Sequence, residues 1–189
     1  MNRNRNTPIV LFISLLAMLT LPALAQQAES QPLGITQPSP VRNIEEYLLE
    51  KKKDNLAIKG YDPVAYFKEG GGEPTKGDKD ITTTYKEVTY RFASEKHKSL
   101  FLADPAKYEP AFGGWCAWAM SSGDKTEIDP KTFIIQDGRL FLFYNGFWGN
   151  TKDDWQKGDK AELARKADLN WKSISGQSPR IPPTPTKQP

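Results

Sequence analysis

The segment from Phe133 to Tyr144 can form little other than a β-hairpin. Two apolar runs, FII and LFLFY, flank the dipeptide Asp137-Gly138. Asp-Gly is favoured in two-residue type I′ turns because both central residues need a positive φ. We therefore expect an antiparallel pair of strands here.

A second hairpin is expected over residues 81–92, where apolar and polar side chains alternate around Lys86-Glu87. Short helices are expected where an N-cap residue precedes a helical stretch. The expected N-caps are Asn43, Asp62, Ser94, Asp104 and Asp159. The helix after Asn43 is expected to reach Lys51. These elements predict an α+β fold, a single small domain of two β-hairpins packed with several short helices.

Proline-rich stretches without apolar periodicity mark both ends of this domain. They divide the chain into a leader at 1–25, a linker at 26–42, the globular domain at 43–174 and a proline-rich tail at 175–189. We expect the linker and the tail to be flexible.

The leader is typical of a secretory signal peptide. Arg3 and Arg5 precede an apolar run at 9–21, and Ala23-Leu24-Ala25 suits cleavage before the next residue. We expect Sec-type export, a periplasmic or secreted location, and no stable membrane span once the leader is removed. The alternative is that the leader is retained as an anchor.

The charge of the chain gives no sign of a nucleic-acid partner. The sequence holds 26 basic and 23 acidic residues, and two of the basic ones, Arg3 and Arg5, belong to the leader. The remaining charge is nearly balanced, whereas a nucleic-acid-binding protein usually carries a clear basic bias. We expect no nucleic acid among the partners.

Two scarce residue types set the chemistry of any site. Cys116 and His97 are the sole cysteine and histidine, which excludes an internal disulfide and a zinc site of Cys₄ or Cys₂His₂ type within one chain. Met120 stands four residues after Cys116, so both sulfur atoms share a face if the segment is helical. Thiolate and thioether ligands suit Cu(I). A copper site at Cys116 and Met120, with His97 as a further ligand, is one hypothesis.

Other roles for these residues stay open. Cys116 is also the type of residue that is most often buried in a core, and with His97 it could form a reactive thiol pair. A homodimer would bring two Cys116 side chains together. The aromatic residues either line an apolar pocket or pack the core. They are Tyr61, Tyr66, Phe67, Trp115, Trp118, Trp148 and Trp155.

Four blocks of sequence carry a resemblance to a known family. They are Gly60-Tyr61-Asp62-Pro63-Val64-Ala65-Tyr66-Phe67, Tyr90-Arg91-Phe92-Ala93-Ser94, Phe101-Leu102-Ala103-Asp104-Pro105-Ala106-Lys107-Tyr108 and Gly113-Gly114-Trp115-Cys116-Ala117. In order and spacing they resemble the exported YHS-domain proteins of bacteria, from about Gly60 to Trp171. The resemblance implies a YHS-like fold, and relatives attached to copper-transporting proteins carry paired cysteines.

This chain departs from the paired-cysteine pattern, because Ala93 stands where those relatives tend to carry cysteine. Metal binding would then rest on Cys116, Met120 and His97. Tyr61 and Asp62 are candidate oxygen donors, and Trp115 and Trp118 are further candidate ligand-binding residues. No catalytic residue is assigned.

Three functions follow as hypotheses. The first is an exported non-catalytic YHS-type binding module that handles copper through Cys116. The second is a structural or protein-interaction domain in which Cys116 is buried and inert. The third is a thiol-dependent enzyme that uses Cys116 and His97. The partner is accordingly a metal ion, another protein or a second copy of the chain.

Overall fold

The hairpin around Asp137-Gly138 forms as its sequence predicts. In the computed structural model, which describes residues 42–180, β5 (Asp129–Gln136) pairs antiparallel with β6 (Arg139–Phe143). Gln136 lies opposite Arg139, and the two residues between them have φ of 51° and 71°. Both values are positive, as a type I′ turn requires.

The first hairpin is also confirmed, and it belongs to a larger sheet. β3 (Asp78–Tyr85) and β4 (Val88–Phe92) are joined by Lys86-Glu87, and both of these residues have positive φ. Two short strands, β1 (Leu49–Glu50) and β2 (Leu56–Ala57), extend the sheet. The strand order is β1-β2-β4-β3, with β2 parallel to β4.

The predicted helix from Asn43 to Lys51 is wrong. A 3-10 helix covers only Ile44–Glu46, the Asn43 side chain caps nothing, and β1 begins at Leu49. Leu49 pairs with Ala57 across the sheet. Pairing with β2, which follows closely along the chain and itself pairs with β4, has overridden the local helical preference of these residues.

Five α-helices complete the described region, with short 3-10 turns between elements. The α-helices are α1 (Glu95–Ala103), α2 (Pro105–Tyr108), α3 (Ala117–Ser121), α4 (Thr151–Lys157) and α5 (Lys160–Ser175). The further 3-10 segments are Lys51–Lys53, Ile58–Gly60, Lys68–Gly70 and Ala111–Gly114. Ser94, Asp104 and Asp159 cap their helices as predicted. Asp62 opens a turn and not a helix.

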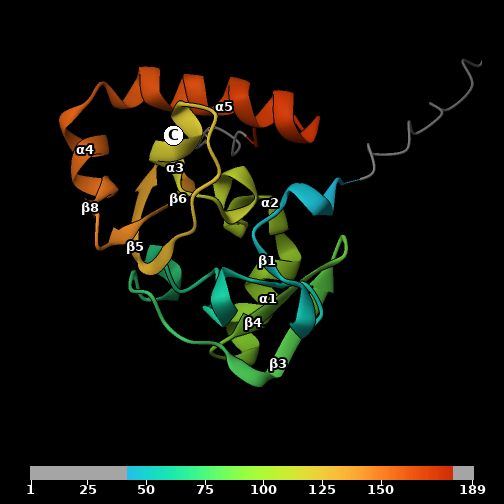
Figure 1. Cartoon of the computed structure of the whole chain (residues 1–189). Coiled ribbons are helices and arrows are strands. Elements are labelled where there is room, and N and C mark those ends of the chain that lie inside the picture. The colour runs from blue at the N-terminus through green and yellow to red at the C-terminus, as the bar shows by residue number, and fades with distance from the viewer. Residues whose placement is uncertain (1–41, 181–189) are drawn as a thin grey trace, which may run out of the picture. The chain divides into compact units, whose positions relative to one another are not determined.

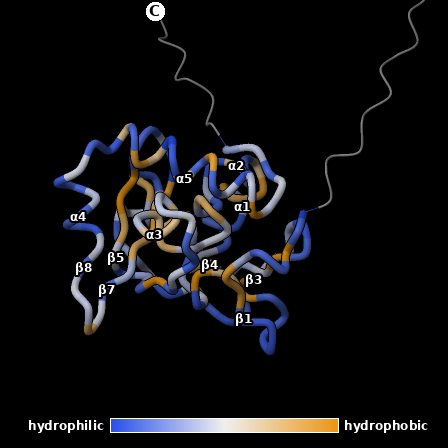
Figure 2. The backbone as a smooth tube through the Cα atoms, turned by 45° about the horizontal axis from the view of Figure 1, so that its top comes forward, coloured by the Kyte–Doolittle hydropathy of each residue, from blue (hydrophilic) through white to orange (hydrophobic). Residues whose placement is uncertain are grey.

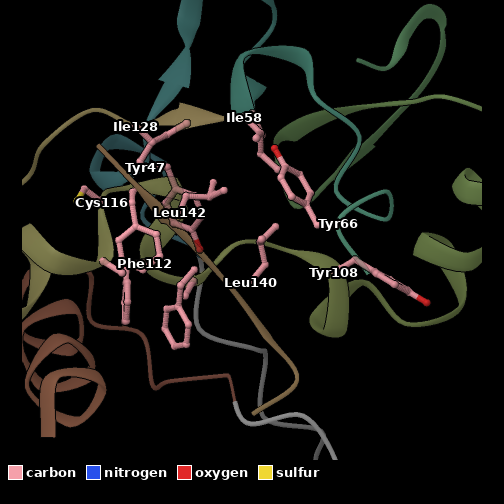
Figure 3. Close-up of a cluster of buried hydrophobic side chains, with 14 of the residues drawn as sticks. Tyr47, Ile58, Tyr66, Tyr108, Phe112, Cys116, Ile128, Leu140 and Leu142 are labelled. Carbon is pink, nitrogen blue, oxygen red and sulfur yellow. The ribbon is translucent and has the colours of Figure 1, made fainter. Parts of the chain in front are cut away.

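The helices divide between the two hairpins. α1 packs against β3 and β4, whereas α3, α4 and α5 gather on the side of β5 and β6 (Figure 1). One continuous core joins the two parts, and the rings of Tyr66 and Phe133 meet within it at 5.0 Å. Figure 3 shows part of this core, from Ile58 and Tyr66 across Leu140 and Leu142 to Phe112 and Cys116. The mixed α+β class is therefore as expected.

Contacts of the domain extend past the predicted range of 43–174. Arg42 on one side, and Gln177 and Arg180 on the other, bond to residues of the domain. The predicted leader (1–25), most of the predicted linker and residues 181–189 of the predicted tail lie outside the described residues. Within 42–180, no helix combines the length and the apolar character needed to cross a membrane.

Candidate functional site

Cys116 lies at the start of α3 and is fully buried. Its Sγ atom lies 3.3 Å from the Thr151 hydroxyl and accepts a hydrogen bond from the backbone N–H of Tyr144 at 3.4 Å. The Met120 side chain is equally buried, one helical turn further along. A thiol can both donate and accept hydrogen bonds, so both neighbours can bond to the Cys116 sulfur.

The glycines before Cys116 are needed for close packing. Gly113 has a φ of +60°, and a Cβ atom placed there would lie 2.7 Å from the indole ring of Trp171. Only glycine adopts that backbone region without a steric cost. The Gly-Gly-Trp-Cys block therefore lets α5 approach the turn that leads into α3.

Asp62 and His97 form the second polar centre. Asp62 is fully buried, and its Oδ1 atom accepts a hydrogen bond from the Val64 N–H at 2.8 Å. Its Oδ2 atom accepts from the Ala93 N–H at 2.7 Å and lies 2.6 Å from Nδ1 of His97. His97 is held on the first turn of α1, where its N–H donates to the Ser94 cap. This pair ties the Asp62 turn, the end of β4 and α1 together.

The remaining predicted ligand-binding residues lie in other places. Tyr61 is half-buried beneath the Lys76 ammonium, which sits 4.6 Å from its ring centroid. Trp115 is half-buried and donates from its indole N–H to the Glu46 carbonyl at 2.6 Å. Trp118 is half-buried on α3. None of these makes a polar contact with Cys116.

The predicted metal ligands therefore fall into separate groups. His97 bonds to Asp62, whereas the polar neighbours of Cys116 are Thr151 and Tyr144. Among residues 42–180 no three side chains of His, Cys, Asp or Glu gather as a metal site requires. Copper binding therefore remains a prediction from the sequence, because the described residues do not bring His97 together with Cys116.

A different feature stands out on the surface, a small hairpin that we call the aromatic finger (residues 145–150). It consists of β7 (Asn145–Gly146) and β8 (Gly149–Asn150), with Phe147 and Trp148 at its tip. The side chains at the tip are 90% and 86% exposed. Their rings meet edge to face at 4.9 Å. Figure 2 shows this apolar tip projecting from the body of the domain.

The base of the finger is fastened by the residues around Cys116. Tyr144 and Thr151 are the residues just before and just after the finger, and the Thr151 N–H donates to the Tyr144 carbonyl at 3.1 Å. Both residues are also the polar neighbours of the Cys116 thiol. The Tyr144 ring lies against Gly146, and its hydroxyl accepts from the Trp148 N–H at 3.3 Å. The buried sulfur thus holds the two ends of an exposed aromatic hairpin.

An open hollow lies at the foot of the finger. Its volume is about 300 Å³, and its lining residues are Lys59, Glu127, Ile128, Asp129, Pro130, Tyr144 and Asn145. Lys59 bridges the Glu127 carboxylate at 3.2 Å and the Ile128 carbonyl at 3.0 Å. Both Ile58 and Lys59 have a φ of 50°, which is rare for a β-branched residue such as Ile58 and tends to occur at functional sites.

Comparison with protein-family models, with curated proteins and with solved structures finds no match to this chain. The assignment of function therefore depends on the geometry of the described residues. That geometry offers a fully buried thiol, a buried Asp62–His97 pair, and an exposed aromatic finger beside a hollow.

Sequence reasoning did not single out the finger. It placed Trp148 among the residues of a pocket or core, and the structure corrects this because Trp148 is exposed. The available signal was the pattern Asn-Gly-Phe-Trp-Gly-Asn, in which turn-forming residues bracket two aromatic ones. Tyr66 and Trp155, in contrast, are core residues.

Proposed function

We propose that this chain is an exported, non-catalytic binding module that binds its partner through the aromatic finger. The observation that carries the proposal is the near-complete exposure of Phe147 and Trp148 at the tip of a two-stranded hairpin. Covering a large exposed aromatic side chain with a partner removes apolar surface from water, which is favourable. Exposed apolar groups of this size therefore mark interaction sites. Tryptophan is also among the residues that most often dominate binding interfaces.

The surroundings of Cys116 support binding more than catalysis. Its thiol is fully buried and is engaged by Thr151 and Tyr144, whereas a catalytic thiol must be reachable by a substrate. In this proposal Cys116 is a positioning residue for the finger. It corresponds to the hypothesis of an interaction domain with an inert cysteine.

Photocrosslinking tests the proposal directly. The photoreactive amino acid p-benzoylphenylalanine is incorporated at position 147 in the cells that naturally make the protein. A matched control strain carries it at position 102 instead, because Leu102 is 52% exposed on α1. We expect discrete adducts from position 147 and none from position 102. Excess wild-type protein should compete for the partner and suppress these adducts, whereas an excess of the Trp148→Ala variant should not. The same adduct pattern from both positions, or no adduct from position 147, would contradict the proposal.

The replacement Cys116→Ser separates this proposal from copper handling. Because a hydroxyl costs more to bury than a thiol, we expect the free energy of unfolding to fall by about 1–2 kcal/mol. We expect the native thiol to react with Ellman's reagent only after unfolding, since it is buried. Guanidinium titration measures the free energy of unfolding, and labelling with and without denaturant measures the reactivity of the thiol.

A competitive Cu(I) titration completes this comparison. Under the interaction proposal, wild-type protein and Cys116→Ser compete equally poorly with a Cu(I) chelator. Tight binding that depends on Cys116, with one ion per chain or per two chains, would instead favour the copper hypothesis.

A further inference from the structure

We propose that the occupant of the aromatic finger is a second copy of this chain, so that the finger of each copy enters the hollow of the other. This inference rests on the proposed function, because it names the partner that the finger binds. The hollow is the one at the foot of the finger, lined by Lys59, Glu127, Ile128, Asp129, Pro130, Tyr144 and Asn145.

The first argument is the position of a protrusion beside a depression. Tyr144 and Asn145 line the hollow, and Asn145 is also the first residue of the finger. The Tyr144 hydroxyl accepts a hydrogen bond from the Trp148 N–H. A surface that carries an adjacent knob and hole can pair with a copy of itself through a two-fold axis, which is the commonest symmetry of soluble oligomers.

The second argument is size. A hollow of about 300 Å³ stands at the small end of the range for ligand pockets, and it suits a side chain better than a large free ligand. An aromatic side chain buries roughly 150–250 Å², so the four tip rings of a pair would bury about 600–1,000 Å². Specific, stable interfaces bury at least about 1,200 Å² of surface in total. The rim of the hollow therefore has to contribute, and the expected dimer is a weak one.

The third argument is charge. The hollow carries both signs, with Lys59 beside Glu127 and Asp129, and Lys152 and Asp153 follow the finger. An aromatic centre with a polar rim of both signs has the composition of a protein interface. A lipid surface is a poorer fit. Insertion of the finger would bring the carboxylates around it close to the headgroups, and anionic headgroups would repel these carboxylates.

Sedimentation equilibrium tests the inference on protein produced from the full sequence. We expect wild-type protein to show a concentration-dependent monomer–dimer equilibrium, with a blue shift of tryptophan emission as the dimer forms. Trp148→Ala should weaken dimerisation roughly 100-fold, because a loss of about tenfold applies at each of two equivalent contacts. Glu127→Arg, which changes the charge and size of the rim, should also weaken it.

Leu169→Ala provides the matched control, since Leu169 is 56% exposed on α5 and belongs neither to the finger nor to the lining of the hollow. It should leave the equilibrium unchanged, and circular dichroism should show that all variants are folded. A dimer that persists in Trp148→Ala would overturn the inference. A wild-type monomer up to about 1 mM would overturn it as well, and the proposed function would still stand if position 147 crosslinked to a different protein.

Discussion

Asp62→Ala should lower the free energy of unfolding by about 3–5 kcal/mol. The Asp62 carboxylate is fully buried and is the acceptor for the N–H groups of Val64 and Ala93, and it pairs with Nδ1 of His97. Alanine removes the shared acceptor of these donors, of which the Val64 N–H is buried and the Ala93 N–H and His97 Nδ1 are partly buried. Each unsatisfied buried polar group costs about 1–3 kcal/mol, and the three losses occur together.

Urea unfolding at neutral pH measures this loss, with Asp124→Ala as the control. Asp124 is an exposed aspartate in a loop, and its replacement should change the free energy of unfolding by less than about 0.5 kcal/mol. A cycle with Asp62→Asn, His97→Gln and the double variant then isolates the coupling of the pair. A coupling near zero would mean that the backbone N–H bonds, and not His97, account for the role of Asp62.

The local elements of the fold could be predicted because their signals are local. Asp137-Gly138 forms the tight turn that its residues require, and Ser94 and Asp104 cap helices that start directly after them. In each case the interacting atoms lie within a few residues of one another. Periodicity and cap chemistry are sufficient at that range.

The errors came from pairing partners that the local helical pattern does not reveal. The residues after Asn43 carry a helical pattern, yet Leu49 pairs with Ala57 in a sheet that also includes β4. The turn at Asp62 contains the residues of a helix start, but its carboxylate also accepts from Ala93, 31 positions later. Nothing in the local sequence announces such partners.

The candidate site shows the same division. Cys116, Met120, His97 and Asp62 were chosen by residue type, and the structure brings Asp62 and His97 together but gives Cys116 a separate setting beneath the finger. The exposure of Phe147 and Trp148 could not be read from the sequence, because an aromatic pair between turn residues is compatible with burial or with exposure. Exposure depends on whether the rest of the fold covers the pair.

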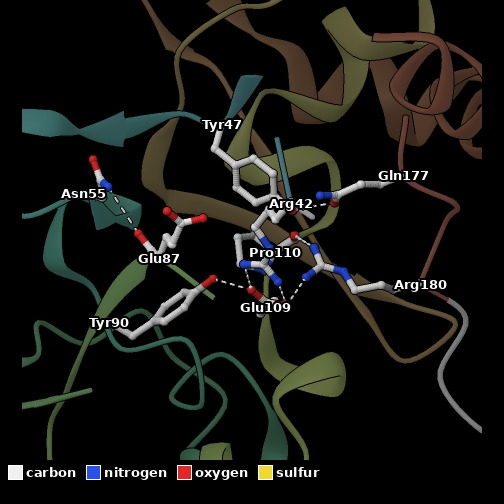
Figure 4. Close-up of polar contacts among 9 residues, drawn as sticks. All are labelled: Arg42, Tyr47, Asn55, Glu87, Tyr90, Glu109, Pro110, Gln177 and Arg180. Carbon is white, nitrogen blue, oxygen red and sulfur yellow. Dashed lines mark hydrogen bonds and ion pairs between the residues drawn. The ribbon is translucent and has the colours of Figure 1, made fainter. Parts of the chain in front are cut away.

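The second large effect is expected at Glu109, which joins the two ends of the described chain. Its buried carboxylate accepts from the two terminal guanidinium nitrogens of Arg42, at 2.6 and 3.0 Å, and from the Tyr90 hydroxyl at 2.6 Å. Arg180 also pairs with it (Figure 4). Glu109→Gln removes the charge that offsets two arginines, and Arg42 is itself buried. Loss of one partner in a buried ion pair costs about 3–5 kcal/mol.

The pKa of Glu109 gives this prediction a pH signature. Burial raises the pKa of the carboxyl, but the positive charges of Arg180 and Arg42 and the hydrogen bond from Tyr90 outweigh burial and hold the pKa below its ordinary value of 4.5. A carboxyl with a lowered pKa in the folded state stabilises the protein fully above the unfolded value, and loses that contribution as the pH falls through the folded value.

We therefore expect the stability difference between wild-type protein and Glu109→Gln to be constant from about pH 7 to pH 5, and to shrink below pH 4.5 as the wild-type carboxyl takes up a proton. Urea unfolding at a series of pH values measures it. The control is Glu73→Gln, because Glu73 is exposed and should give parallel curves. A difference that stays the same down to pH 3 would show that the shape of the Glu109 side chain, and not its charge, holds Arg42 and Arg180 in place.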